Sequence, residues 1–489
     1  MCVQRARACL LGALLFVFCS QRTLAQYSSP DDAFVPPVTV APQSSGNQGV
    51  AVPPSDSADF DQFSPLRTAL QEGDPADSEE APGADLRAQI KQLQEDFKGL
   101  QKKENALEGK PYPRVKANGF FQADYAWFSQ DAANKQQLGN IQDGWDFRRV
   151  RFNLRGDVSD NVEYASEMDF AGSGRPSFRD VSMTIRRDIP LIRNLKFGYW
   201  RQPFGMASLT SSRNFPLLER GLTQTFVPFR QIGMGTFGIN EAKSATYAAS
   251  VYRFPSDNFG GNLGDSGGYG MAGRVTWLPW CDADETHLLH LGAAYSFANP
   301  STNTIQYQTT NEVDQSAGGT LPGQLGTTPP FVNTGVMPAR NQNLFGLELA
   351  SRHGAFWTQS EVMWAQVNQI NAPVVTFPAM YSEAGYLLSR GDRREYDKNA
   401  AVFAGVDPER DFGKEGWGAF EIVGRISYID LNSQNIHGGR LVDLSTGLNW
   451  YLNEYAKLQF VHIHSFLDRQ PTGHSDADAM VMRVMVSFY

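Results

Sequence analysis

Seven arginines are the residues of this chain whose type and spacing could do chemistry. Three recur along one strand-like segment, and four lie in a stretch that neither a strand nor a long helix accounts for. They are Arg149, Arg151 and Arg155, followed by Arg201, Arg213, Arg220 and Arg230. A guanidinium group stays charged and holds oxyanions through paired hydrogen bonds. The pattern therefore predicts binding of small anions rather than bond-making chemistry.

The second group lies in residues 194–238. This segment opens with strand-like alternation at Leu195, Phe197 and Tyr199 and closes with a glycine-spaced run from Arg230 to Gly238. A long loop inside a compact fold is usually functional or disordered. Its large apolar residues argue against disorder; they are Phe204, Leu209, Phe215, Leu217, Leu218 and Phe226. We predict that the loop folds inward and narrows the pore of a β-barrel.

The sequence gives little support for catalysis, metal binding or nucleic-acid binding. The Gly-x-Ser-x-Gly match at residues 264–268 falls within the long connection 255–268 and not on a turn from a strand to a helix, so it makes no nucleophile elbow, and no triad can be assembled. We therefore predict no enzyme and no cofactor. His462 and His464 share one face and His287 and His290 are three apart, but neither pair has a Cys or an acid at ligand spacing. We therefore expect no metal site. The charge pattern does not suggest nucleic-acid binding.

The N-terminal part divides into three segments. Residues 1–25 carry Arg5, Arg7, an apolar run and Thr23-Leu24-Ala25, which predicts a secretory signal peptide. Residues 26–84 hold ten of the acids against one arginine in a chain of net charge −9, and their Pro, Ser and Asp predict a disordered acidic linker. Residues 85–110 predict a periplasmic coiled coil from a heptad seam, with a lone amphipathic helix as the alternative. The seam residues are Leu86, Ile90, Leu93, Phe97, Leu100 and Leu107.

Residues 111–489 predict an all-β fold, a sixteen-stranded antiparallel transmembrane β-barrel. No later stretch has about 18 consecutive apolar residues, so an exported chain of this kind is either soluble or an outer-membrane barrel. A soluble sandwich also alternates, but here short and long connections alternate too, as they do in a barrel with one short-turn rim. Aromatic residues near strand ends and a final strand from Ala479 to Tyr489 point the same way.

The free-energy cost of exposing a charged side chain to lipid decides which face of each strand is on the outside of the barrel. An arginine facing lipid near the midplane costs about 2–4 kcal/mol, so the strand of Arg149, Arg151 and Arg155 must turn them into a wet lumen. Lys116 and Arg274 also fall on inward positions. The alternative to pore lining is structural: the arginines bridge acids of the neighbouring strand or tie Glu219 of the loop to the wall.

Three short motifs carry a resemblance to a known family. They are Arg201-Gln202-Pro203-Phe204, Leu209-Thr210-Ser211-Ser212-Arg213 and Glu219-Arg220. The stretches 391–396 and 417–421 agree with it. Residues 112–489 resemble the phosphate-selective porin O and P family. The resemblance implies a homotrimeric outer-membrane porin whose third extracellular loop folds into the lumen, although the sequence alone leaves a dimer open.

The expected function is passive diffusion of small hydrophilic solutes, with inorganic anions such as phosphate as partners, across the outer-membrane lipid. The alternatives are a non-selective or cation-preferring porin, a structural tether, and a barrel enzyme. A short periplasmic turn is expected between Gly391 and Gly416, and the sequence gives no physical reason for the length of this connection.

Overall fold

The computed structural model describes residues 112–171, 176–187, 192–264, 267–313, 328–414 and 416–489. Gln92, Glu95 and Lys98 are also described, and they are helical. The predicted signal peptide (1–25), the acidic linker (26–84) and the rest of the predicted coiled coil (85–110) lie outside the described residues.

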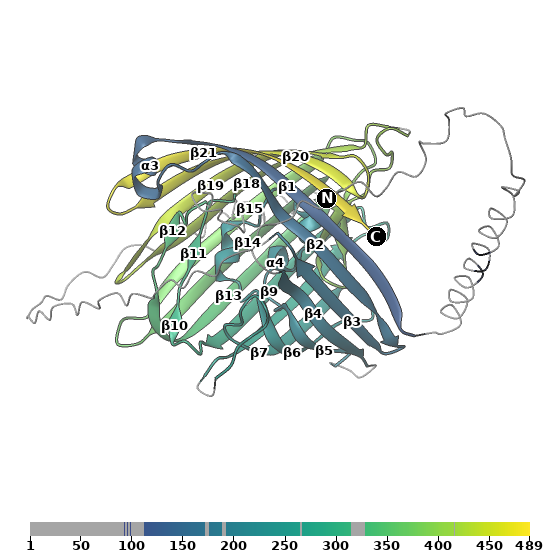
Figure 1. Cartoon of the computed structure of the whole chain (residues 1–489), viewed down its shortest axis with the longest axis horizontal. Coiled ribbons are helices and arrows are strands. Elements are labelled where there is room, and N and C mark those ends of the chain that lie inside the picture. The colour runs from purple at the N-terminus through teal and green to yellow at the C-terminus, as the bar shows by residue number, and fades with distance from the viewer. Residues whose placement is uncertain are drawn as a thin grey trace, which may run out of the picture. The chain divides into compact units, whose positions relative to one another are not determined.

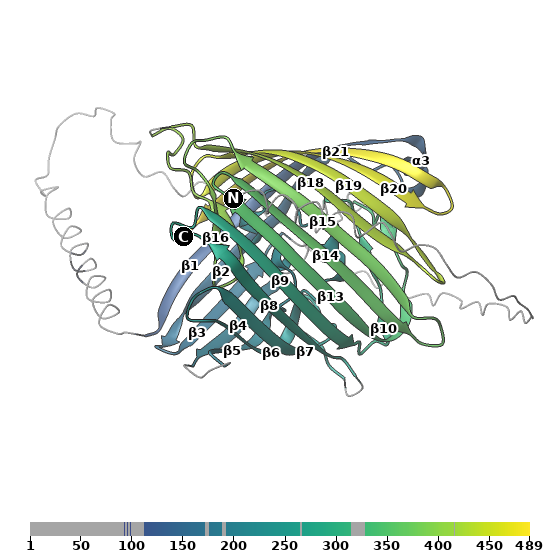
Figure 2. The same ribbon diagram turned by 180° about the vertical axis from the view of Figure 1, so that it is seen from behind.

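Sixteen long strands of the described residues close into one antiparallel barrel, which confirms the predicted fold (Figures 1 and 2). The last strand pairs with the first, for example Phe488 with Gly119, so the ring has no open edge. The strands are β1 (Arg114–Gln130), β2 (Gly144–Ser159), β3 (Val162–Asp169), β4 (Ser177–Arg186), β5 (Asn194–Arg201), β6 (Arg230–Ile239), β7 (Ala245–Arg253), β8 (Tyr269–Cys281), β9 (His287–Asn299), β13 (Met337–His353), β14 (Phe356–Gln369), β15 (Val375–Leu387), β18 (Ala419–Ser433), β19 (Ile436–Tyr451), β20 (Ala456–Arg469) and β21 (Gly473–Phe488).

The two faces of the wall follow the predicted alternation. On β2, Arg149 is 3% exposed and points inward, whereas Phe152 is 40% exposed on the outside. Large apolar side chains such as Leu347 and Met480 are likewise exposed on the outer face. Apolar groups outside and ionic groups inside suit a cylinder with lipid around it and water within.

One rim carries short turns, such as that between β2 and β3, and the other carries long loops, so we take them as the periplasmic and extracellular rims. The first long loop holds the helix α3 (Ala132–Leu138). In the described part of the chain, no helix is long and apolar enough to cross a membrane.

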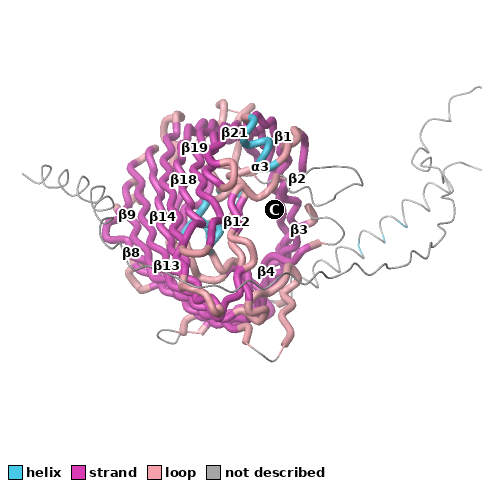
Figure 3. Tube along the Cα trace, turned by 90° about the vertical axis from the view of Figure 1, so that its left-hand side faces the viewer, coloured by secondary structure: helices cyan, strands magenta, loops and turns pink. Residues whose placement is uncertain are grey.

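Three connections fold into the ring of strands (Figure 3). The constriction loop, residues 202–229 between β5 and β6, holds α4 (Met206–Leu209), η1 (Ser212–Asn214) and η2 (Leu222–Phe226). The extracellular segment, residues 300–313 and 328–336, holds β10 (Thr304–Ile305), β11 (Gln308–Thr309) and β12 (Val332–Asn333). The periplasmic hairpin, residues 388–414 and 416–418, holds β16 (Arg394–Asp397) and β17 (Val402–Val406).

Apolar side chains hold these segments inside. Phe226 of the constriction loop lies edge-on to Tyr307 of the extracellular segment, with ring centroids 5.1 Å apart. Phe403 of the periplasmic hairpin packs at 5.5 Å against Trp357 of β14. Full burial of one such side chain stabilises by about 1.5–3 kcal/mol, so part of the barrel interior is a packed core.

The outer face yields a stability prediction. Leu347 is exposed near the middle of β13, so Leu347→Arg should destabilise the barrel by about 2–4 kcal/mol in bilayers. Denaturant titration of protein folded into vesicles measures this, with Leu347→Met as the conservative control. Equal stability of the Arg and Met variants would mean that this face does not meet hydrocarbon.

Candidate pore constriction

Glu219 is the main anchor of the constriction loop. Its carboxylate accepts from Arg148 Nε at 2.9 Å, from Arg149 Nη2 at 2.5 Å and from Arg483 Nη2 at 3.2 Å. Burial disfavours its charged form, but the guanidinium groups of Arg148 and Arg149 outweigh this and hold the pKa of Glu219 below its ordinary value. The loop is therefore tied by an ionised carboxylate to β2 and β21.

Wall side chains also bind the backbone of the loop. These contacts come from five strands and reach five carbonyl groups between residues 212 and 219. Gln122 of β1 donates to Ser212 O at 3.0 Å, Lys457 of β20 to Phe215 O at 2.8 Å, Asn449 of β19 to Pro216 O at 2.8 Å, Arg483 of β21 to Leu218 O at 2.5 Å and Arg425 of β18 to Glu219 O at 2.9 Å. Irregular backbone can lie at membrane depth because these groups satisfy its carbonyls.

Charges also fix the short helix α4. Glu361 accepts from the backbone N–H groups of Met206 and Ala207 at 2.6 and 3.1 Å. At the other end, Arg201 donates to the carbonyls of residues 208, 209 and 210, and Arg220 to those of 207, 208 and 210. Hydrogen-bond acceptors at the start and donors at the end of a helix satisfy its unpaired backbone groups.

The periplasmic hairpin supports the loop from the other side, and it explains the long connection of residues 391–416. Arg394 is bound to Glu421 at 2.9 Å and donates to Asn214 O of the loop at 2.7 Å. Arg274, paired with Glu348 at 2.7 Å, donates to the carbonyls of Ala400 and Ala401. The connection is long because it turns back into the lumen instead of crossing the rim.

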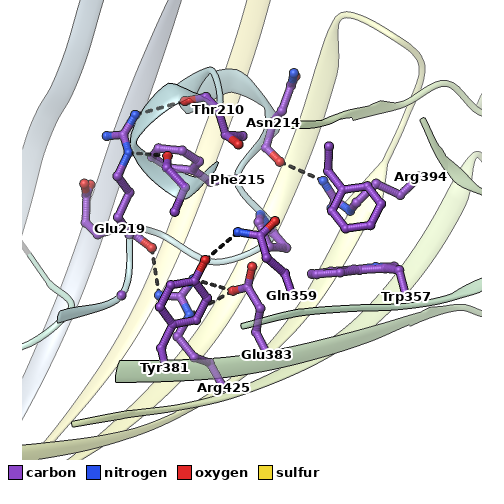
Figure 4. Close-up of a pocket in the computed structure, with 15 residues that line it drawn as sticks. Thr210, Asn214, Phe215, Glu219, Trp357, Gln359, Tyr381, Glu383, Arg394 and Arg425 are labelled. Atoms are coloured by element: carbon purple, nitrogen blue, oxygen red, sulfur yellow. Dashed lines mark hydrogen bonds and ion pairs between the residues drawn. The ribbon is translucent and has the colours of Figure 1, made fainter. Parts of the chain in front are cut away.

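The loop closes one side of the lumen and leaves the other open. Against β14, β15 and β18 there is a cavity of about 20 Å³ beside Glu219, Arg394 and Arg425 (Figure 4), which is room for about one water molecule. On the side of β5 to β8, a cavity of about 430 Å³ remains. The wall takes up little of the lumen here because some of its residues have small side chains or none, among them Gly235, Ala248 and Ser250. This open side is the candidate route for solutes.

The seven predicted arginines take different places. Arg149 pairs with Glu219, Arg151 with Glu167 and Asp169, and Arg230 with Asp180. Arg213 donates to Asn118 at 2.8 Å and lies over the ring of Tyr489. Arg220 stacks on Phe215 at 4.4 Å. Only Arg155 and Arg201 of the seven line the open cavity.

Sequence reasoning did not place Lys196 in the site. It lines the open cavity, with its Nζ 5.7 Å from the ring centroid of Trp200. The alternation of β5 already put Lys196 on the inward face, so the signal was present. What the alternation could not show is which inward positions the loop leaves uncovered.

The fold places the two histidine pairs in different surroundings. His290 is buried between Tyr396 and Glu348, at 2.7 and 3.1 Å, whereas His462 and His464 lie on the outer face beside Asp478. Within the described ranges, no group of three or more His, Cys, Asp or Glu is arranged to hold a metal ion.

A closed sixteen-stranded barrel that is narrowed by inward connections and open along one side of its lumen is an outer-membrane porin. The model of the phosphate-selective porin O and P family matches residues 115–488, and the chain belongs to this family.

The chain is similar to a curated porin and to solved porin structures. Porin O of Pseudomonas aeruginosa is 25% identical over 406 residues, which cover 76% of this chain and 88% of that protein. Among solved structures, an anion-selective porin from Comamonas acidovorans is 11% identical with a TM-score of 0.48, covering 77% of this chain and 100% of its own. A trimer form of OmpT from Vibrio cholerae is 9% identical with a TM-score of 0.46, covering 77% and 99%.

The anchoring of the loop can be tested at Arg220. Arg220→Ala removes three hydrogen bonds to loop carbonyls. Arg201 still binds the carbonyls of residues 208 and 210, so the Ala207 carbonyl loses its guanidinium donor, and one unsatisfied buried group costs about 1–3 kcal/mol. We expect an intact barrel with larger and noisier single-channel conductance in planar bilayers. Arg440→Ala, at an exposed position of β19, is the control. Unchanged conductance in Arg220→Ala would show that this guanidinium does not hold the loop.

Proposed function

We propose that this chain is a passive diffusion channel that prefers small anions such as phosphate. The observation that carries the proposal is the charge of the open side of the lumen. Arg155, Lys196 and Arg201 line the cavity there, and none of the three has a carboxylate partner at ion-pair distance among the described residues. Asp397 of the periplasmic hairpin is the acid that shares the cavity, so the balance is positive.

The three cations are spread along the route. Arg201 ends β5 at the extracellular rim and Lys196 lies five residues nearer the periplasm, about 17 Å along the strand at about 3.3 Å per residue. Arg155 lies on β2, and the register through β3 and β4 aligns it with Gly198 of β5, between Lys196 and Arg201 in the strand. Spaced cations attract an anion at each step without enclosing it, so the anion can enter and leave. Binding is weak at each step and flow follows the solute gradient.

Most of the predicted arginines have another task in this proposal. Arg149, Arg151 and Arg230 are neutralised by buried carboxylates, and Arg220 serves the loop backbone. They shape the constriction, and Arg213 lies close to the C-terminal Tyr489. Selectivity is therefore assigned to the three cations that line the open cavity, Arg155, Lys196 and Arg201, and Arg201 also binds loop carbonyls through Nη1.

The proposal also covers the oligomeric state and the segments before the barrel. We assign no catalytic activity to the chain, which the porin relatives support. A homotrimer, a signal peptide at 1–25, and a periplasmic linker and coiled coil at 26–110 complete it. The heptad residues before the barrel support the assembly.

The charge of the route sets the reversal potential. Arg155→Gln combined with Lys196→Gln should shift the reversal potential in a salt gradient toward cations, because two unpaired positive charges leave the pore. Arg440→Gln removes one charge outside the lumen and should leave the potential unchanged. A wild-type channel that is already cation-selective would refute the anion preference and leave the porin itself intact.

The tether alternative is tested by removing residues 26–110 while keeping the signal peptide. A channel should still conduct, since the barrel closes between β1 and β21 without that segment. Loss of conductance with a correctly inserted barrel would favour a role centred on the N-terminal segment.

A further inference from the structure

The open side of the lumen is lined by apolar side chains as well as by cations. Four large apolar residues border its cavity of about 430 Å³, namely Trp200, Pro203, Leu209 and Phe237. Phe237 is the most exposed of the four, at 38%. Because transfer of apolar surface out of water is favourable, this side of the lumen suits a solute that has an apolar part.

Phe237 faces the lumen and not the lipid. On β6, Met234 is 54% exposed on the outer face, and Gly235 and Phe237 alternate with it. Successive side chains of a strand point to opposite faces, so Phe237 points inward, where it lines the cavity. Phe226 and Phe403 also lie inside the ring, but they are only 1% and 2% exposed. Phe237 therefore differs from the residues that hold the inward segments, because it has an open surface.

A cation stands beside this ring on the neighbouring strand. Lys196 of β5 pairs with Gly235 of β6, and Phe237 lies two residues further along β6 on the same face. Such diagonal neighbours are about 7–8 Å apart, within reach of long side chains. Gly235 has no side chain to fill the space between them, and Ala248, which pairs with Phe237 from β7, adds only a methyl group. The ammonium group and the ring thus border one recess.

Inorganic phosphate would use only the charged part of this recess. Its oxygens suit the cations, whereas an exposed phenyl ring offers them no hydrogen-bond donor. A ring of the solute can pack against Phe237, and contact between two rings is favourable beyond the area that it buries. Pockets for small organic ligands have about 300–1,000 Å³ and combine apolar or aromatic walls with a few polar or charged groups. The open cavity has this size and this lining.

We infer that the open side of the lumen takes small organic anions that carry a flat ring, of the class of aromatic carboxylates. The carboxylate is held by Lys196, and Arg155 and Arg201 are the other cations of the route. The ring of the solute packs on Phe237 above the small residues of the wall. Each contact is weak, so the solute can still leave. The inference rests on the proposed anion channel and adds the substrate class of the same route.

Block of the chloride current by benzoate and by acetate tests the inference, because the two anions share a carboxylate and differ in the ring. The full-length channel is recorded in planar bilayers in potassium chloride at neutral pH. We expect benzoate to halve the chloride conductance at about one tenth of the concentration that acetate needs, since only benzoate packs on Phe237.

Variants show whether the ring of Phe237 is responsible. Phe237→Ala should raise the half-blocking concentration of benzoate to that of acetate. Phe345→Ala is the matched control, because Phe345 is 45% exposed on the outer face of β13, and it should keep the tenfold difference. Phe237→Leu preserves an apolar side chain, which guards against a folding defect, and should also reduce the difference because leucine has no flat face.

Two results would overturn the inference. One is an equal half-blocking concentration of benzoate and acetate in the wild type, and the other is an unchanged tenfold difference in Phe237→Ala and Phe237→Leu. The reversal potential of the same channel in a salt gradient separates this failure from that of the proposed function. An anion-selective channel that does not distinguish benzoate from acetate leaves the proposed function intact, whereas a cation-selective channel refutes both.

Discussion

The constraint on which this structure depends is that no backbone group can stay unpaired in a bilayer, so a sheet within it has to close. Closure here is made by the first and last strands, paired from Gly119–Phe488 to Gln130–Ala477. Once the ring is closed, every strand residue faces either lipid or lumen. The ionic side chains of β2 then have one acceptable direction, and the wet interior follows from their number.

Inside the ring, most charges hold structure rather than solute. Glu219 joins the constriction loop to β2 and β21, Glu421 holds Arg394, and Glu348 holds Arg274. A buried charge is stable only with a partner and further hydrogen bonds, and these carboxylates and guanidinium groups provide both. In the proposed function, the field of the pore is therefore set by the few cations that lack a carboxylate partner on the open side.

The two rims contribute to the same constriction. The constriction loop enters from the extracellular side and the periplasmic hairpin meets it, with Arg394 of the hairpin bound to Asn214 O of the loop. Their contact fills the lumen against β14, β15 and β18. The larger cavity, the candidate route for solutes, lies against β5 to β8, where Gly235 and Ala248 leave room that larger side chains would occupy.

The sequence by itself determined the barrel, the direction of its faces and the inward course of residues 202–229, because these depend on local alternation and on the cost of charge in lipid. It did not determine which arginines are neutralised or that Lys196 borders the route. Those outcomes depend on partners far apart in the chain: Arg483 and Glu219 are 264 residues apart, and Arg394 and Asn214 are 180 apart. Only closure of the ring brings such groups within hydrogen-bonding distance, so only the tertiary structure decides which charges remain facing water.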